Sequence, residues 1–205
     1  TLSDNDFLTI QNEYRQANKN SNFLADFGIV NNYRSNSLKD KNKTLAHYFV
    51  NYDLDLKLKN FKSSELFLST EQVNNDAYLK IFDSLLTKSK ARPENLNVMN
   101  SQAKLNLIHE KFNFDTGFSI YENLGTSIES DRYQYVLPYY NFDTVLEENY
   151  FNGSISLSSS GSNNLNNTND LKSNIINNIN YNSNNYISNF GFDNDFNVIF
   201  KNLNS

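Results

Sequence analysis

Apolar and polar residues alternate with a period of two along much of this chain. In the longest run, 47–58, every even position is apolar, and of the odd positions only Phe49 is apolar. The even positions are Tyr48, Val50, Tyr52, Leu54, Leu56 and Leu58. A helix would scatter such residues around its circumference, whereas a strand places them on one face. The run therefore predicts a strand with one apolar and one polar face.

The same alternation recurs in other segments and predicts about ten strands in all. The clearer ones are 23–30, 114–121, 154–158 and 190–200, and the weaker ones are 7–15, 66–71, 78–82, 103–112, 133–145 and 171–181. Polar clusters at 31–43, 87–101 and 158–170 are typical of connections. Asparagine is so frequent in 163–189 that strand ends cannot be placed there.

The strand length and the aromatic content favour a membrane wall. A strand that crosses a bilayer needs about 9–11 residues, whereas ordinary strands have about five or six. The chain holds 16 Phe and 13 Tyr, yet its mean hydropathy is only −0.65. A wall with lipid on one side and water on the other combines both properties. We predict an all-β fold, an antiparallel transmembrane β-barrel segment, with residues 1–205 as a fragment of a single outer-membrane domain. A soluble β-sandwich binding module is the alternative.

Composition narrows the remaining classes. The chain starts at Thr1 without a basic region followed by an apolar stretch, so we expect a piece of a longer protein whose signal peptide is absent here. It contains no Cys, which removes disulfides and thiolate metal ligands from consideration. Lys and Arg are scattered and the net charge is −5, so we expect no nucleic-acid partner.

Few residues are candidates for chemistry. The two histidines, His47 and His109, both lie in strand patterns, and we interpret them as polar strand positions. Ser119 is the serine that a hydrolase site would pair with a histidine, but serines occur in nearly every predicted strand. Two acidic pairs, Asp53 with Asp55 and Asp193 with Asp195, suit calcium or acid–base work but also the water-facing side of a strand. We therefore predict a protein that is not an enzyme, with no catalytic residue, no cofactor and no metal. An outer-membrane hydrolase is the weaker alternative.

One segment carries a family resemblance. Residues 130–142 place a proline within an aromatic, alternating strand, where proline removes a ladder hydrogen bond. The residues that form this motif are Asp131, Arg132, Tyr133, Leu137, Pro138 and Tyr139. They resemble the R-x-x-x-(I/V)-L-P strand of the lipopolysaccharide-assembly outer-membrane proteins, the LptD family. Segments 12–16, 74–80 and 151–155 resemble other parts of that barrel in the same order, so that the resemblance covers about residues 10–200.

This resemblance implies a function and partners. Members of the family form a large barrel that, with a plug lipoprotein, receives lipopolysaccharide from periplasmic bridge proteins and delivers it to the outer leaflet. The implied location is the outer membrane of a Gram-negative cell, in contact with its lipids. The family's N-terminal periplasmic domain is not in this chain, and neither are its disulfide-forming cysteines. The matched piece is the middle of the barrel, so no gate residue is carried over. A porin or another outer-membrane transporter is the alternative function.

Overall fold

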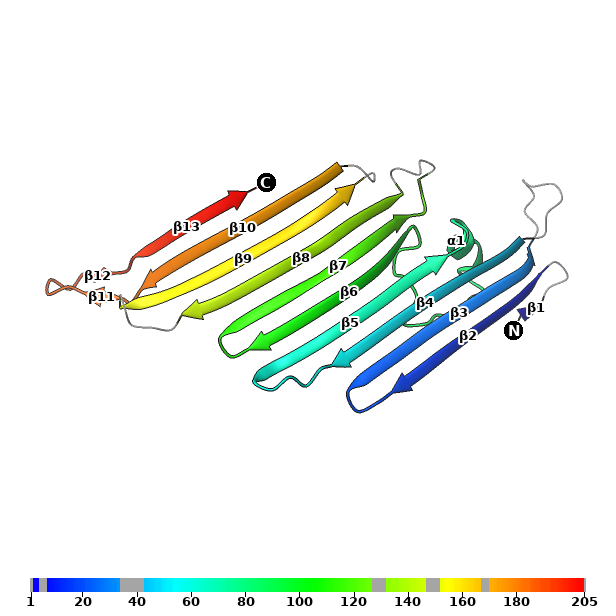
Figure 1. The fold of residues 1–205 in the computed structure, drawn as a ribbon, viewed down its shortest axis with the longest axis horizontal. Helices are drawn as coiled ribbons and strands as arrows, with labels where there is room; N and C mark the ends of the chain where they lie inside the picture. Colours follow the sequence, from blue (N-terminus) through cyan, green and yellow to red (C-terminus); the bar gives the residue numbers. More distant parts are fainter. Residues whose placement is uncertain are drawn as a thin grey trace.

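In a computed structural model, the chain forms one large antiparallel sheet (Figure 1). The structure describes residues 2–3, 7–33, 43–126, 132–146, 152–166 and 170–204. Within these ranges the main sheet has eleven strands, each beside its neighbour in the sequence except that β13 follows β10. This simple up-and-down order confirms the predicted all-β, antiparallel class, and the strand number is close to the predicted ten.

The strands from β2 to β10 have 10 to 14 residues, longer than is usual in soluble proteins. The main sheet consists of β1 (Leu2–Ser3), β2 (Leu8–Ala17), β3 (Ser21–Tyr33), β4 (Lys43–Asp55), β5 (Phe61–Val73), β6 (Val98–His109), β7 (Phe112–Asn123), β8 (Tyr133–Leu146), β9 (Gly153–Asn166), β10 (Asp170–Ser183) and β13 (Asn197–Asn204). Two short strands, β11 (Tyr186–Ile187) and β12 (Asp193–Asn194), form a separate hairpin between β10 and β13.

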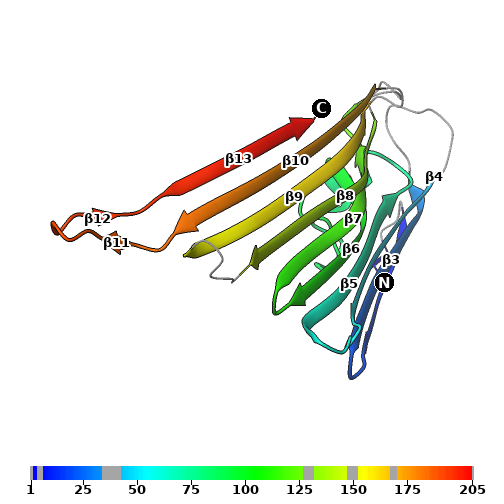
Figure 2. The same ribbon diagram turned by 60° about the vertical axis from the view of Figure 1, so that its left-hand side comes forward.

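The sheet is curved across its strands and has two open edges, one at β1 and β2 and the other at β13 (Figure 2). The connection between β5 and β6, residues 74–97, folds back over one side of the sheet, on the inside of the curve (Figures 1 and 2). We call the side that carries this connection the inner face, and the opposite side the outer face. Paired residues of antiparallel strands point to the same side, so the register assigns each strand position to a face.

The connection 74–97 contains α1 (Tyr78–Phe82), the α-helix of the described residues. The prediction of a strand at 78–82 was wrong. Tyr78, Leu79 and Phe82 are all buried, a one-sided spacing that matches a helical turn better than a period of two. A short apolar run looks the same in both patterns, and here packing against the sheet decides between them.

Three other sequence predictions need correction. The segment 158–170 was expected to be a loop, but β9 continues through it to Asn166. The run 190–200 was expected to be one strand, whereas β13 begins only at Asn197. The strand predicted at 47–58 ends at Asp55, so Leu56 and Leu58 lie in the connection to β5. That connection includes Lys57 and Asn60, both with positive φ, which ends the alternation.

Pro138 lies in a β-bulge. The pairing of β8 with both neighbours skips from Val136 to Tyr139, with one fewer residue skipped on each partner strand. A bulge is one of the few places where a strand tolerates proline, because the ladder is already interrupted there. The extra residue also reverses which residues of β8 face outward, so that Tyr135 and Tyr140 both lie on the outer face.

Candidate functional site

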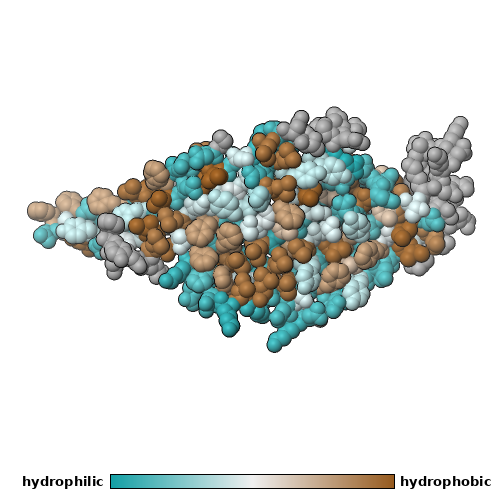
Figure 3. Space-filling model, in the orientation of Figure 1, coloured by the Kyte–Doolittle hydropathy of each residue, from teal (hydrophilic) through white to brown (hydrophobic). Residues whose placement is uncertain are grey.

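The outer face carries a broad apolar surface (Figure 3). In the register of β3 to β5, Ala25 pairs with Val50 and Phe23 pairs with Tyr52. The same face includes Leu8, Ile10, Phe23, Phe27, Ile29, Tyr48, Val50, Tyr52, Leu54, Leu66, Leu68, Leu105, Leu107, Phe114, Phe118 and Phe142. Several of these side chains are about half exposed, for example Ile10 and Ile29 at 50%. Exposed apolar surface that extends over several strands marks contact with a partner or a membrane.

Aromatic side chains gather near one end of the outer face, where the shorter connections 18–20, 56–60 and 110–111 lie. Phe23 lies between Tyr14 and Tyr52, with ring centroids 6.0 and 6.4 Å away. A second group joins Phe61, His109, Phe112 and Phe142 through centroid distances of 4.9 to 6.0 Å. An aromatic zone at one margin of an apolar band is the arrangement found where a barrel wall meets the water interface.

On the inner face, polar side chains are buried under residues 74–97. Asp26 and His47 are 1% and 4% exposed, and His47 Nε2 lies 3.5 Å from Asp26 Oδ1. Gln11 donates to both oxygens of Asp26 at 3.0 Å. Gln11 also pairs with the backbone of Thr87, donating to its carbonyl at 3.1 Å and accepting from its amide at 2.8 Å. These contacts join β2 and β3 to the far end of the connection.

Tyr78 of α1 completes this polar cluster. Its hydroxyl lies 2.9 Å from His47 Nδ1. Burial raises the pKa of Tyr78, and the nearby Asp26 carboxylate raises it further, so the hydroxyl stays protonated beside His47. The His47 ring stacks on Phe49 and covers Gly28, where a Cβ atom would lie only 2.2 Å from the ring. Because Asp26, His47 and Tyr78 are buried, this part of the cluster positions the connection on the sheet and is not open to a substrate.

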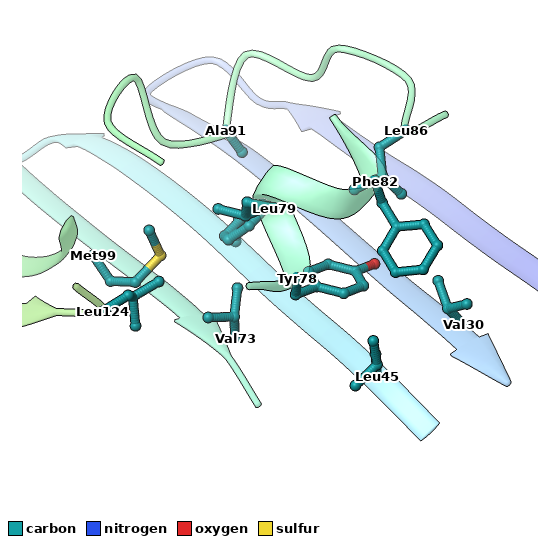
Figure 4. Close-up of a cluster of buried hydrophobic side chains, with 11 residues drawn as sticks. Val30, Leu45, Val73, Tyr78, Leu79, Phe82, Leu86, Ala91, Met99 and Leu124 are labelled. Atoms are coloured by element: carbon teal, nitrogen blue, oxygen red, sulfur yellow. The ribbon is translucent and has the colours of Figure 1, made fainter. Parts of the chain in front are cut away.

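Apolar packing holds the same connection in place (Figure 4). Phe49 of β4 is 1% exposed, which explains why an apolar residue occurs at this otherwise polar face. The buried cluster consists of Val30, Leu45, Phe49, Val73, Tyr78, Leu79, Phe82, Leu86, Ala91, Met99 and Leu124. Residues of β3, β4, β5 and β6 thus share one core with residues 78–91. The connection is a fixed part of the inner face and not a loosely attached loop.

An ion-pair network ties the connection to the start of β8, the strand that contains Pro138. Arg132 pairs with Asp76 at 2.8 Å and with Glu122 at 2.6 Å, and Tyr133 donates its hydroxyl to Glu122 at 3.0 Å. The hydrogen bond to Asp76, followed by those to Glu122, raises the pKa of Arg132. Of the motif residues, Arg132, Tyr133, Leu137, Pro138 and Tyr139 belong to or border β8, whereas Asp131 lies outside the described residues.

The inner face of β9 and β10 differs from that of β2 to β5. Its central positions are hydroxyl and amide side chains without charge. They are Ser154, Ser156, Ser158, Ser160, Ser162, Asn174, Asn178 and Asn180. Figure 2 shows no described segment over these two strands. An open depression of about 540 Å³ lies here, lined by Tyr139, Ser160, Ser162 and Ile176 among others. The centre of this surface offers many weak polar contacts and no charged side chain of β9 or β10.

The other sequence candidates do not converge on a catalytic site. His109 accepts a hydrogen bond from the Lys111 amide at 3.2 Å and stacks on Phe112, while Ser119 lies buried in the middle of β7. Asp55 pairs with Lys57, and Asp193 accepts from Asn185. In the described ranges, no three His, Cys, Asp or Glu side chains are grouped to hold a metal ion.

Sequence reasoning missed Asp26 and Tyr78 as partners of His47, and Gln11 as a partner of Asp26. One signal was present, because Gly28 interrupts the inner positions of β3 and leaves room for a ring from β4. The contribution of α1 came from a segment predicted as a strand, so its hydroxyl could not be placed. The structure aligns Tyr48, Val50, Tyr52 and Leu54 on the outer face, on the side opposite His47 and Phe49.

Two further findings complete the description. In the described part of the chain, no helix is long and apolar enough to cross a bilayer. Comparisons with protein-family models, with curated proteins and with solved structures found no match for this chain.

Proposed function

We propose that this chain forms part of the wall of an outer-membrane β-barrel that delivers lipopolysaccharide to the outer leaflet of a Gram-negative outer membrane. The observation that carries the proposal is the division of one long-stranded antiparallel sheet into an exposed apolar outer face and a polar inner face. Unpaired backbone groups cannot face lipid, so such a sheet has to close with further strands at its two open edges. The inside of the curve is then the lumen.

The lipopolysaccharide part of the proposal rests on the resemblance of residues 130–142 to the LptD family. The bulge at Pro138 supports it, since it gives a structural role to the residue that makes the motif unusual. The role proposed for this chain is structural and not catalytic. A plug lipoprotein and periplasmic bridge proteins are its proposed partners, as the resemblance implies.

A porin or another transporter is the second candidate, favoured by one observation. Residues 74–97 pack onto the inner face, as a segment that narrows a lumen would. The pore of a porin selects solutes by their charge. In that case the charged inner face of β2 to β5 would line the pore.

Depletion of the full-length protein from its cell separates the two candidates. Our proposal predicts less lipopolysaccharide at the cell surface and accumulation at the inner membrane. Unchanged lipopolysaccharide together with slower uptake of small hydrophilic solutes would reject it in favour of the porin.

A further inference from the structure

The hairpin between β10 and β13 carries highly exposed apolar residues, and Phe190 is the most exposed large apolar residue of the described chain. Residues 186–196 leave the main sheet and extend beyond it as β11 and β12 (Figure 1). Five large side chains there have exposed fractions from 60% to 90%: Tyr186, Ile187, Phe190, Phe192 and Phe196. Exposed apolar surface this concentrated requires a partner.

The backbone at the tip already has hydrogen-bond partners within the hairpin. The Ser188 amide donates to Phe192 O at 2.8 Å, and the Gly191 amide donates to Ser188 O at 2.9 Å. The Phe192 amide donates to Ser188 Oγ, and Asn194 Nδ2 donates to the carbonyls of Tyr186 and Phe192. Gly191 permits this closed turn through its φ of +81°. A strand of another protein would find few unpaired backbone amides and carbonyls here with which to form a sheet. A bilayer interface can take up such a turn, because the backbone groups that would be costly to bury are already hydrogen-bonded.

The location of the tip favours the same partner. It lies at the same end of the strands as the connections 18–20, 56–60 and 110–111, the end where the aromatic residues of the outer face gather. Residues 184–196 contain Asp193 and Asp195 but no Lys or Arg, so attraction to anionic headgroups cannot hold them. Aromatic rings at a bilayer surface need no such attraction.

We propose that residues 186–192 are an interfacial anchor, which places Phe190 and Phe192 among the headgroups of the leaflet at this end of the barrel. The proposal rests on the membrane wall proposed above, and extends the aromatic zone of β2 to β8 to the edge strand β13. The anchor would hold the hairpin against the membrane at the point where the sheet ends.

The test uses the full-length protein in vesicles of phosphatidylcholine and phosphatidylethanolamine. Phe190→Cys carries an environment-sensitive fluorophore, and because Phe190 is 90% exposed the change removes no packing. Val50→Cys reports the wall, and Lys59→Cys reports a turn outside the membrane. We expect blue-shifted emission at residue 190, with stronger quenching by a quencher on the headgroup than by one deep in the acyl chains. Residue 59 should be quenched by neither.

Two outcomes would overturn the proposal and are distinguishable. Quenching at residue 50 with none at residue 190 would support the membrane wall and reject the anchor. The same result is expected if a soluble protein, and not the membrane, covers the tip of the hairpin. Absence of quenching at both residues would reject the wall as well.

Discussion

The two halves of the sheet differ in what defines their inner face. In β2 to β5 this face holds buried and charged side chains such as Asp26 and Glu71, and residues 74–97 cover part of it. In the centre of β9 and β10 it holds mostly uncharged Ser and Asn, and nothing described lies over it. If the pairing of two strands shifted by one residue, each strand would turn its core residues outward in the first half of the sheet. In much of the second half, the same shift would replace Ser or Asn on one face by Ser or Asn from the other face. Register and stability are therefore concentrated in the first half.

The largest effect is expected at Phe49. Replacement of this buried ring by alanine removes the contact between β4 and the connection 74–97, and should lower the free energy of unfolding by about 3–5 kcal/mol. In the other half, Ile176→Ala should cost about 1 kcal/mol, because Ile176 lies on an uncovered surface. Guanidinium titrations of the full-length protein in lipid vesicles measure both. Equal costs would contradict the contrast between the halves.

The next largest effect tests the outer face. Val50 lies near the middle of β4, so an arginine there would enter the centre of the bilayer and should destabilise the barrel by about 2–4 kcal/mol. Leu54 lies one residue from the strand end, and Leu54→Arg should cost about 0–1 kcal/mol. Asn51→Arg, on the inner face, is the matched control. The same vesicle titration would refute the assignment if Asn51→Arg proved as costly as Val50→Arg.

A smaller effect is expected where rings cover glycines. Gly28→Ala would push against the buried His47 ring and should cost about 1–3 kcal/mol. Gly161 lies similarly under Tyr140, where an added Cβ atom would lie 2.5 Å from the ring. Tyr140 is only half-buried on the outer face, so its ring can move and Gly161→Ala should cost less. The midpoints of thermal or denaturant unfolding measure both variants. A larger loss of stability for Gly161→Ala than for Gly28→Ala would contradict the buried cluster around His47.

The smallest effect is expected at Arg132. Arg132→Gln removes ion pairs with Asp76 and Glu122 but leaves a polar side chain, and should cost about 1 kcal/mol. Much of that cost comes from Glu122, which is 6% exposed and loses its cation. Glu122→Gln in the same background should then recover part of the loss. Additive costs in this double-mutant cycle would show that the two residues do not interact.

The sequence predicted the strands of the first half of the sheet better than those of the second half. The alternation in β4 set its two faces correctly from Tyr48 to Leu54, since each face there has a different chemistry. In β9, Ser158 to Asn166 read as a loop because both faces are polar, and only pairing with β8 and β10 makes this segment a strand. The helix at Tyr78 depended on the shape of the surface beneath it. The local pattern therefore could not identify Tyr78 as a partner of His47, and finding Asp26 required the register between β3 and β4.

The most direct test of the central claim compares neighbouring residues on β4. Residues 1–205 contain no Cys, so once any cysteine elsewhere in the full-length protein is replaced, single cysteines at Tyr48, Val50 and Tyr52, or at Asn51 and Asp53, can each carry one fluorophore. With the full-length protein in vesicles, we predict that acyl-chain quenchers reduce the signal at the first three positions and leave the last two unchanged. Equal quenching at both sets, or none at either, would contradict a sheet with one side in lipid and the other in water.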